Sequence, residues 1–260
     1  MRIGFNPANF EMITEVLAVR PDYLELPINK IVDDPPEKID ELRRLLQSYG
    51  VLAECFNVLL KSGQKITDDG YDRADFREYL DKAFYIMKSL GGCVAVFGSG
   101  DSRRISDFSK LDKCAAQVED FVGMLDDYAK EYGMRIAIEP LSPDAVNYIN
   151  TVAQAYELAS RVDSDYVGVL ADLYHMPLSG DDFSNIVKAA DKLLHIHIAN
   201  PTDRKFPREG DGYDGYALFF DALRKANYNG RITVEASTDD IAADAKLSLK
   251  FLEKYSHSLN

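Results

Sequence analysis

An apolar run followed by a helical stretch recurs eight times along the 260 residues of this chain, once in about 32 residues. The runs occupy residues 2–6, 23–27, 51–58, 93–98, 135–140, 166–172, 194–199 and 231–236. Apolar residues recur at steps of three and four, the spacing of one helix face, along residues 36–50, 72–90, 109–132, 150–162, 216–227 and 240–256. Glycines that can end a helix precede four of the runs, at Gly50, Gly92, Gly133 and Gly230.

This alternation of strand and helix predicts a parallel sheet with helical crossovers. Eight such units in roughly 250 residues are the size of a closed (β/α)8 barrel, the TIM barrel. An open doubly wound sheet is the alternative, but it often carries a glycine-rich nucleotide loop, and GSG at 98–100 does not match that motif. We therefore predict an α/β TIM barrel, with residues 1–260 forming a single domain.

The charge balance restricts the partners of the chain. It has 43 acidic and 30 basic side chains, a formal net charge of −13, whereas nucleic acids and anionic membranes bind concentrated basic surfaces. We expect neither a secretory leader nor a membrane span, since no long apolar run follows a basic flank in the first residues. Three cysteines without a CxxC motif suit a reducing compartment. We expect a cytoplasmic protein with no nucleic-acid or membrane partner.

Polar side chains end four consecutive apolar runs. Glu139 ends the fifth run, Asp172 the sixth and Glu235 the eighth, while His197 lies in the seventh. The active site of a TIM barrel lies at the carboxyl ends of its strands, so we expect these four side chains to converge. One carboxylate at a strand end is commonly a helix cap, but four buried ionisable groups without a cation would cost several kcal/mol. The set favours Mn²⁺, with Mg²⁺ and Co²⁺ as alternatives.

Two further histidines, His195 and His175, are candidates for positions near the predicted metal centre, to which His197 belongs. His195 and His197 are two residues apart in one strand, so both face the same side of it. We place His197 at the rim and His195 one layer deeper, as a hydrogen-bonded residue of the barrel interior. His175 follows Asp172 by three residues and either reaches the substrate or is a surface loop residue.

Further candidates for contact with a substrate lie in other strands and loops. Arg204 and Arg208 follow the seventh strand, in a loop rich in glycine, proline and aspartate. Arg204 could bind a substrate hydroxyl or phosphate, whereas Arg208 is better explained as a solvated loop charge. Glu25 in the second run and Asn57 in the third either line the pocket or are structural.

Together these residues resemble the xylose isomerase-like barrels, specifically the sugar phosphate isomerase/epimerase group that includes the ketose 3-epimerases. The residues that carry the resemblance are Glu139 in IEP, Asp172 and His175 in DLYH, His197 in HIH, Arg204 in RKFPREG and Glu235 in VEA. The resemblance implies that Glu139, Asp172, His197 and Glu235 bind a divalent metal. It also implies that Glu139 and Glu235 form the acid/base pair, and that His175 and Arg204 contact the substrate. Family members are often dimers or tetramers, so a homo-oligomer is a further expectation.

The sequence departs from the ketose 3-epimerase pattern around the expected substrate pocket. After Glu139, the positions that carry asparagine, arginine and glutamate in those enzymes hold Ser142, Pro143 and Ala145. In the later loop Arg208 replaces a glycine. The resemblance therefore implies the metal centre but not the specificity of a tagatose or psicose epimerase.

The chemistry that the resemblance implies is metal-dependent isomerisation or epimerisation of a small sugar or sugar phosphate. A proton next to a carbonyl is removed, an enediolate forms, and a second carboxylate returns the proton. One alternative is a lyase or dehydratase that uses the same enolate. Another is a non-catalytic carbohydrate-binding subunit. A DNA-repair endonuclease would need more histidines and a basic groove.

Overall fold

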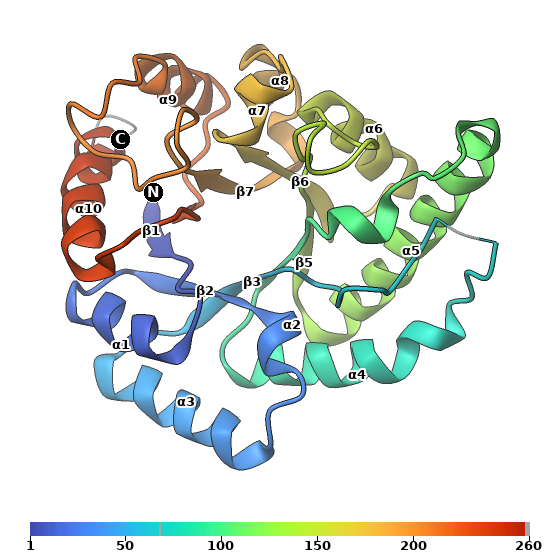
Figure 1. Cartoon of the computed structure of the whole chain (residues 1–260), viewed down its shortest axis with the longest axis horizontal. Coiled ribbons are helices and arrows are strands. Elements are labelled where there is room, and N and C mark those ends of the chain that lie inside the picture. The colour runs from blue at the N-terminus through green and yellow to red at the C-terminus, as the bar shows by residue number, and fades with distance from the viewer. Residues whose placement is uncertain (68, 258–260) are drawn as a thin grey trace.

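The computed structural model describes residues 1–67 and 69–257 and confirms the predicted barrel (Figure 1). Eight parallel strands pair in chain order, and β1 pairs with β8 to close the barrel. The strands are β1 (Arg2–Phe5), β2 (Tyr23–Pro27), β3 (Ala53–Asn57), β4 (Val94–Phe97), β5 (Arg135–Ile138), β6 (Val167–Asp172), β7 (Leu193–Ile198) and β8 (Arg231–Val234).

Helices surround the barrel (Figure 1). Those that correspond to the six predicted stretches are α3 (Pro36–Tyr49), α4 (Ala74–Ser89), α5 (Leu111–Tyr132), α6 (Val152–Val162), α9 (Tyr216–Lys225) and α10 (Ile241–His257). Four shorter helices were not located in the sequence, namely α1 (Phe10–Ala18), α2 (Ile28–Ile31), α7 (His175–Leu178) and α8 (Ser184–Lys188). Among the described residues, no helix is both long enough and apolar enough to cross a bilayer.

The helix ends follow the glycine prediction at only two of the four positions. Gly50 and Gly133 have φ values of 68° and 60°, the left-handed conformation that ends α3 and α5. The other two assignments were wrong, because the left-handed residues there are Gly91, with a φ of 103°, and Asn227, with a φ of 51°. Asparagine tolerates this conformation better than most other side chains do, so it can replace a glycine at a helix end.

The strand ends also differ from the prediction. The apolar runs continue to residues 140 and 236, but β5 ends at Ile138 and β8 at Val234. Glu139 and Glu235 are therefore the first residues after their strands, and their backbone N–H groups still bond to the neighbouring strands, on Phe97 and Ile198. Both side chains thus leave the barrel at its carboxyl end, where a TIM barrel binds its ligands.

The barrel interior combines apolar and polar side chains. Its apolar part is a small buried cluster separate from the main core between strands and helices, consisting of Tyr23, Cys55, Val94, Val96, Ala137 and Leu170. Tyr23 fills space that is free only because residue 4 is glycine, since a Cβ there would lie 2.4 Å from the tyrosine ring. The Tyr23 hydroxyl bonds to that of Thr233 at 2.8 Å, and Thr233 lies 3.3 Å from His195 Nε2. A polar layer therefore lies below the rim.

Candidate metal centre

The structure brings together four side chains at or just past the carboxyl ends of strands β5 to β8. One ligand atom from each of Glu139, Asp172, His197 and Glu235 lies within 4.8 Å of the others. Strand register explains part of this, because Asp172 pairs with His197 in the sheet and thus lies at the same level. Glu139 and Glu235 reach the same level from the residues just past their strands.

The four side chains differ in exposure. Glu139, Asp172 and His197 are buried, and His197 has no exposed surface. The Glu235 side chain is 19% exposed, so the cluster opens to solvent on its side. A small ligand can therefore reach the cluster past Glu235.

Glu139 is held by its backbone as well as by its side chain. The fully buried guanidinium of Arg103 donates to the carbonyl oxygen of Glu139 at 2.7 Å and to that of Phe97 at 3.2 Å. Close packing fixes the carboxylate, since a Cβ at Gly98 would lie 1.9 Å from Glu139 Oε2. Only glycine at position 98 leaves room for the carboxylate in this place.

His197 presents one ring nitrogen to the cluster and the other to the barrel interior. Its Nδ1 lies 3.0 Å from Glu139 Oε1 and 3.8 Å from Glu235 Oε2. Its Nε2 lies 2.8 Å from Oε1 of Glu25, whose other oxygen is 2.8 Å from His195 Nε2. The placement of His195 as a hydrogen-bonded interior residue is confirmed. Glu25, for which the sequence left a pocket position and a structural position open, lies fully buried behind His197.

Two predicted substrate contacts lie against Glu235. Asn57, the last residue of β3, donates from Nδ2 to Glu235 Oε1 at 2.5 Å, and Arg204 donates to Glu235 Oε2 at 3.1 Å. The guanidinium carbon of Arg204 lies 4.6 Å from the ring centre of Tyr174, a stacking arrangement that keeps Arg204 over the open side. Arg208, in contrast, pairs with Asp244 at 3.3 Å, as expected for a loop charge.

His175 lies beside Asp172, as the first residue of α7. Its Nδ1 accepts the backbone N–H of Ser142 at 3.1 Å, so the proton of the neutral ring is on Nε2. That Nε2 lies 3.7 Å from Asp172 Oδ2. His175 therefore presents an N–H donor toward the cluster, in a position to bind a substrate oxygen.

The cluster concentrates negative charge around one imidazole. Burial, together with the carboxylates of Glu139 and Asp172, raises the pKa of Glu235 to about 7 against the opposite effects of His197 and Arg204. Burial also acts to raise the pKa of Glu139, but His197 outweighs it and holds that pKa below its usual value. Burial acts to lower the pKa of His197, yet the surrounding glutamates raise it well above the ordinary value. A bound cation would relieve this repulsion between carboxylates.

Several residues at the site were missed by the sequence analysis. Arg103 and Gly98 follow β4 in a loop that has no periodic pattern, and Tyr174 was not identified as a candidate. Asn6 follows β1 directly and donates to the Asn57 side chain at 3.2 Å. Its position just past a strand end was a usable signal, the same one that identified Glu139.

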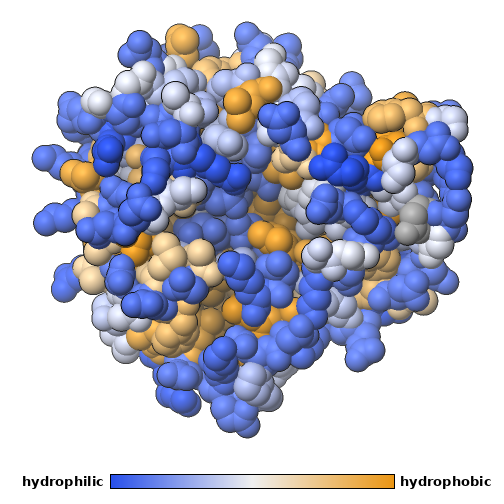
Figure 2. Space-filling model, viewed as in Figure 1, coloured by the Kyte–Doolittle hydropathy of each residue, from blue (hydrophilic) through white to orange (hydrophobic). Residues whose placement is uncertain are grey.

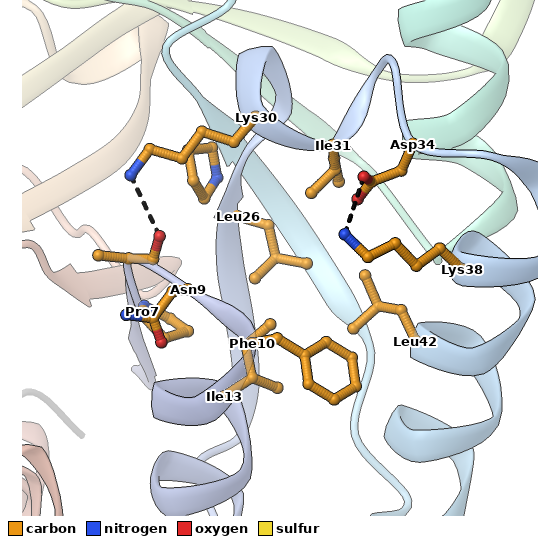
Figure 3. Close-up of a pocket in the computed structure, with 12 residues that line it drawn as sticks. Pro7, Asn9, Phe10, Ile13, Leu26, Lys30, Ile31, Asp34, Lys38 and Leu42 are labelled. Atoms are coloured by element: carbon orange, nitrogen blue, oxygen red, sulfur yellow. Dashed lines mark hydrogen bonds and ion pairs between the residues drawn. The ribbon is translucent and has the colours of Figure 1, made fainter.

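A separate pocket of about 220 Å³ opens beside the barrel, between β2, the segment that follows β1, and helices α1, α2 and α3 (Figure 3). Apolar side chains including Phe10, Leu26 and Leu42 line it, and Figure 2 shows apolar surface on this side of the molecule. Its two lysines already have partners, since Lys30 donates to the Ala8 carbonyl and Lys38 pairs with Asp34. None of the four clustered ligand residues lines it, so we place the chemistry at the cluster.

A family model described as the xylose isomerase-like TIM barrel matches residues 17–255. An L-ribulose 3-epimerase from Methylomonas sp. is 27% identical over 87% of this chain and 77% of its own length. A probable ketose 3-epimerase from Synechocystis is 36% identical, but that match spans 40% of this chain and 35% of the relative.

The fold is similar to that of solved structures over the full chain. One, titled as the IOLI protein with a bound zinc atom, has a TM-score of 0.75 and 20% identity, and the match covers 100% of this chain and 99% of that one. At this identity the likeness establishes the fold alone.

Proposed function

The chain belongs to the xylose isomerase-like TIM barrel family, and from that premise we propose that it is a metal-dependent isomerase or epimerase of a sugar or sugar phosphate. The observation that carries the proposal is the cluster of three carboxylates and one imidazole at the carboxyl end of the barrel. The L-ribulose 3-epimerase that aligns over most of this chain supports the same reaction class.

The residues present fit a divalent cation. Glu139, Asp172, His197 and Glu235 would hold it, because their ligand atoms are close enough to share one ion and because their charges repel without one. Three oxygen donors and one imidazole suit Mn²⁺, Mg²⁺ or Co²⁺, and of these we propose Mn²⁺. When bound, the ion supplies Lewis-acid stabilisation of the negative charge that develops on the substrate oxygens.

Glu139 and Glu235 are the proposed acid/base pair. One carboxylate removes the proton next to the substrate carbonyl, and the other returns a proton to the resulting enediolate. Return to the same carbon from the opposite face gives an epimer, whereas return to the adjacent carbon interchanges aldose and ketose. Neighbouring residues fix the positions of the two carboxylates. Glu139 is held by Arg103 and by the space at Gly98, and Glu235 is held by Asn57.

His175, beside Asp172, and Arg204, beside Glu235, would bind the substrate. The Nε2–H of His175 is available to a substrate oxygen, and the Arg204 side chain is 40% exposed beside Glu235. Hydrogen bonds and positive charge at these places stabilise an oxygen on which negative charge accumulates. Tyr174, under the Arg204 guanidinium, limits the movement of that side chain.

Solvent-deuterium incorporation tests the proposal. Manganese-loaded protein is incubated in D₂O with ketoses, aldoses and their phosphates, and products are followed by mass and proton spectra. We expect incorporation at one carbon with the skeleton retained, and loss of that incorporation after chelation and in Glu139→Gln and Glu235→Gln. An eliminated product would support the lyase alternative instead, and tight sugar binding without exchange would support a binding subunit.

A further inference from the structure

Glu25 has no part in the proposed acid/base step, yet it directly contacts the histidine of the metal centre. It lies in β2 with no exposed surface, and its two oxygens lie 2.8 Å from His197 Nε2 and 2.8 Å from His195 Nε2. A buried carboxylate is tolerated only when strong hydrogen bonds replace its water. The two histidines supply those bonds, so Glu25 and the histidines depend on each other.

The bond from Glu25 determines which nitrogen of His197 is free to bind an ion. A neutral imidazole carries one N–H, and the carboxylate of Glu25 accepts it from Nε2. The lone pair is then on Nδ1, which faces Glu139 and Glu235. A carboxylate on the far nitrogen of a ligating histidine fixes the ring and makes it a stronger donor.

We infer that Glu25 is a positioning residue, which holds His197 with Nδ1 directed at the ion, and that His195 in turn holds Glu25. The inference rests on the proposed metal centre, because it concerns how tightly that centre binds its ion. Of the two roles that the sequence left open for Glu25, substrate contact and structural residue, this inference develops the second.

His195 and the β2 backbone hold Glu25 in place. His195 Nδ1 has no hydrogen-bond partner in the described part of the chain, so a proton on Nδ1 would be a buried donor without an acceptor. The proton of the neutral His195 ring is therefore on Nε2, which donates to Glu25. The register between β2 and β3 shifts between Leu24 and Glu25, an irregularity of the kind that redirects a strand side chain. Asn6 further fixes this segment by donating to the Glu25 carbonyl at 3.1 Å.

Metal affinity and the proton position on the histidines test the inference without turnover. Mn²⁺ affinity is measured by competition with a chelator in the wild type, Glu25→Leu and Glu25→Gln. Ring nitrogens are followed by NMR on ¹⁵N-histidine protein loaded with Zn²⁺, which is diamagnetic. Glu54→Gln is the matched control, since Glu54 is a buried carboxylate in β3 that bonds to Arg2 and Arg231 instead.

We expect Glu25→Leu to weaken Mn²⁺ binding by about 10- to 100-fold. The chemical shift of the His197 Nε2–H proton should also leave the range that is typical of a hydrogen-bonded proton. Glu25→Gln keeps an oxygen for one histidine, so it should lose less affinity, roughly tenfold, and move the His195 proton to Nδ1. If Glu25→Leu does not fold, the Mn²⁺ affinity of Glu25→Gln tests the positioning role of Glu25. Glu54→Gln should keep wild-type affinity even if its thermal stability falls.

Two different failures are distinguishable. Wild-type protein that binds neither Mn²⁺ nor Zn²⁺ at this cluster would refute the metal centre and the inference with it. Wild-type binding combined with unchanged affinity in the Glu25 variants would overturn the positioning role alone and leave the proposed function standing. Equal losses in the Glu25 and Glu54 variants would also overturn it, since they would indicate general destabilisation.

Discussion

Replacing Arg103 by methionine should destabilise the protein strongly, although this arginine forms no salt bridge among the described residues. Its guanidinium has no exposed surface and donates to three backbone carbonyls, those of Phe97, Glu139 and Tyr148. Burial lowers the pKa of Arg103 to about 10, so it stays charged at neutral pH. Methionine matches much of its volume but donates no hydrogen bond.

The expected magnitude follows from the carbonyls that lose a partner. The Phe97 carbonyl keeps the backbone N–H of Glu139 at 3.1 Å, whereas those of Glu139 and Tyr148 retain no other donor among the described residues. An unsatisfied buried polar group costs about 1–3 kcal/mol; the Glu139 bond is buried and the Tyr148 bond only partly, so the loss in the free energy of unfolding should be about 2–4 kcal/mol. With a urea m-value of about 3 kcal/mol/M, the unfolding midpoint should fall by roughly 1 M.

Urea unfolding followed by circular dichroism measures this, and the neighbouring arginine provides the control. Arg104 bonds to the Ala145 carbonyl and to Asp101, but its side chain is 39% exposed, so water can replace those partners. Arg104→Met should change stability by less than about 1 kcal/mol. Equal effects of the two substitutions, or an Arg103→Met loss below 1 kcal/mol, would refute the claim that the hydrogen bonds of Arg103 to buried carbonyls stabilise the fold.

Three further predictions concern the metal centre. Gly98→Ala should weaken Mn²⁺ binding in chelator competition, because the new Cβ would displace the Glu139 carboxylate. The control is Gly123→Ala in α5, where a Cβ has its nearest neighbour at 3.7 Å; this substitution should leave Mn²⁺ binding unchanged. Glu235→Gln should abolish turnover while circular dichroism shows an intact fold; near-normal activity would remove Glu235 from the mechanism. Without an ion the pKa of Glu235 is raised to about 7 and that of His197 is raised well above its ordinary value, so below pH 7 the ion must displace a proton from each. Mn²⁺ affinity should therefore fall by more than tenfold per pH unit below 7, with proton release measurable by calorimetry in two buffers, and a flat profile would contradict these shifts.

The barrel and the cluster were predictable for the same reason. Alternating strand and helix predicted the barrel, and in a parallel barrel all strands end at one face, so polar residues at the ends of apolar runs had to meet. Glu139, Asp172, His197 and Glu235 were found in this way. No knowledge of the loops was needed for that inference.

Other residues depend on contacts between segments that are distant in the sequence. Arg103 is important because a loop folds back onto the ends of β4 and β5, and nothing in its neighbours indicates that path. The sequence identified Glu25 as a candidate but did not predict how deep it lies in the barrel. Side chains alternate between the two faces of a strand, and a residue at the rim shows the same alternation as one below it. Helices α7 and α8 have four and five residues, too few to show a helical period.

The fit of Tyr23 against Gly4 restricts how this barrel can evolve. A side chain at position 4 would occupy the space of the tyrosine ring, and a smaller residue at position 23 would remove the hydroxyl that bonds to Thr233. Substitutions at positions 4 and 23 should therefore covary among relatives. A laboratory library that diversifies position 4 alone should return glycine among its stable members, and other residues only when position 23 is varied with it.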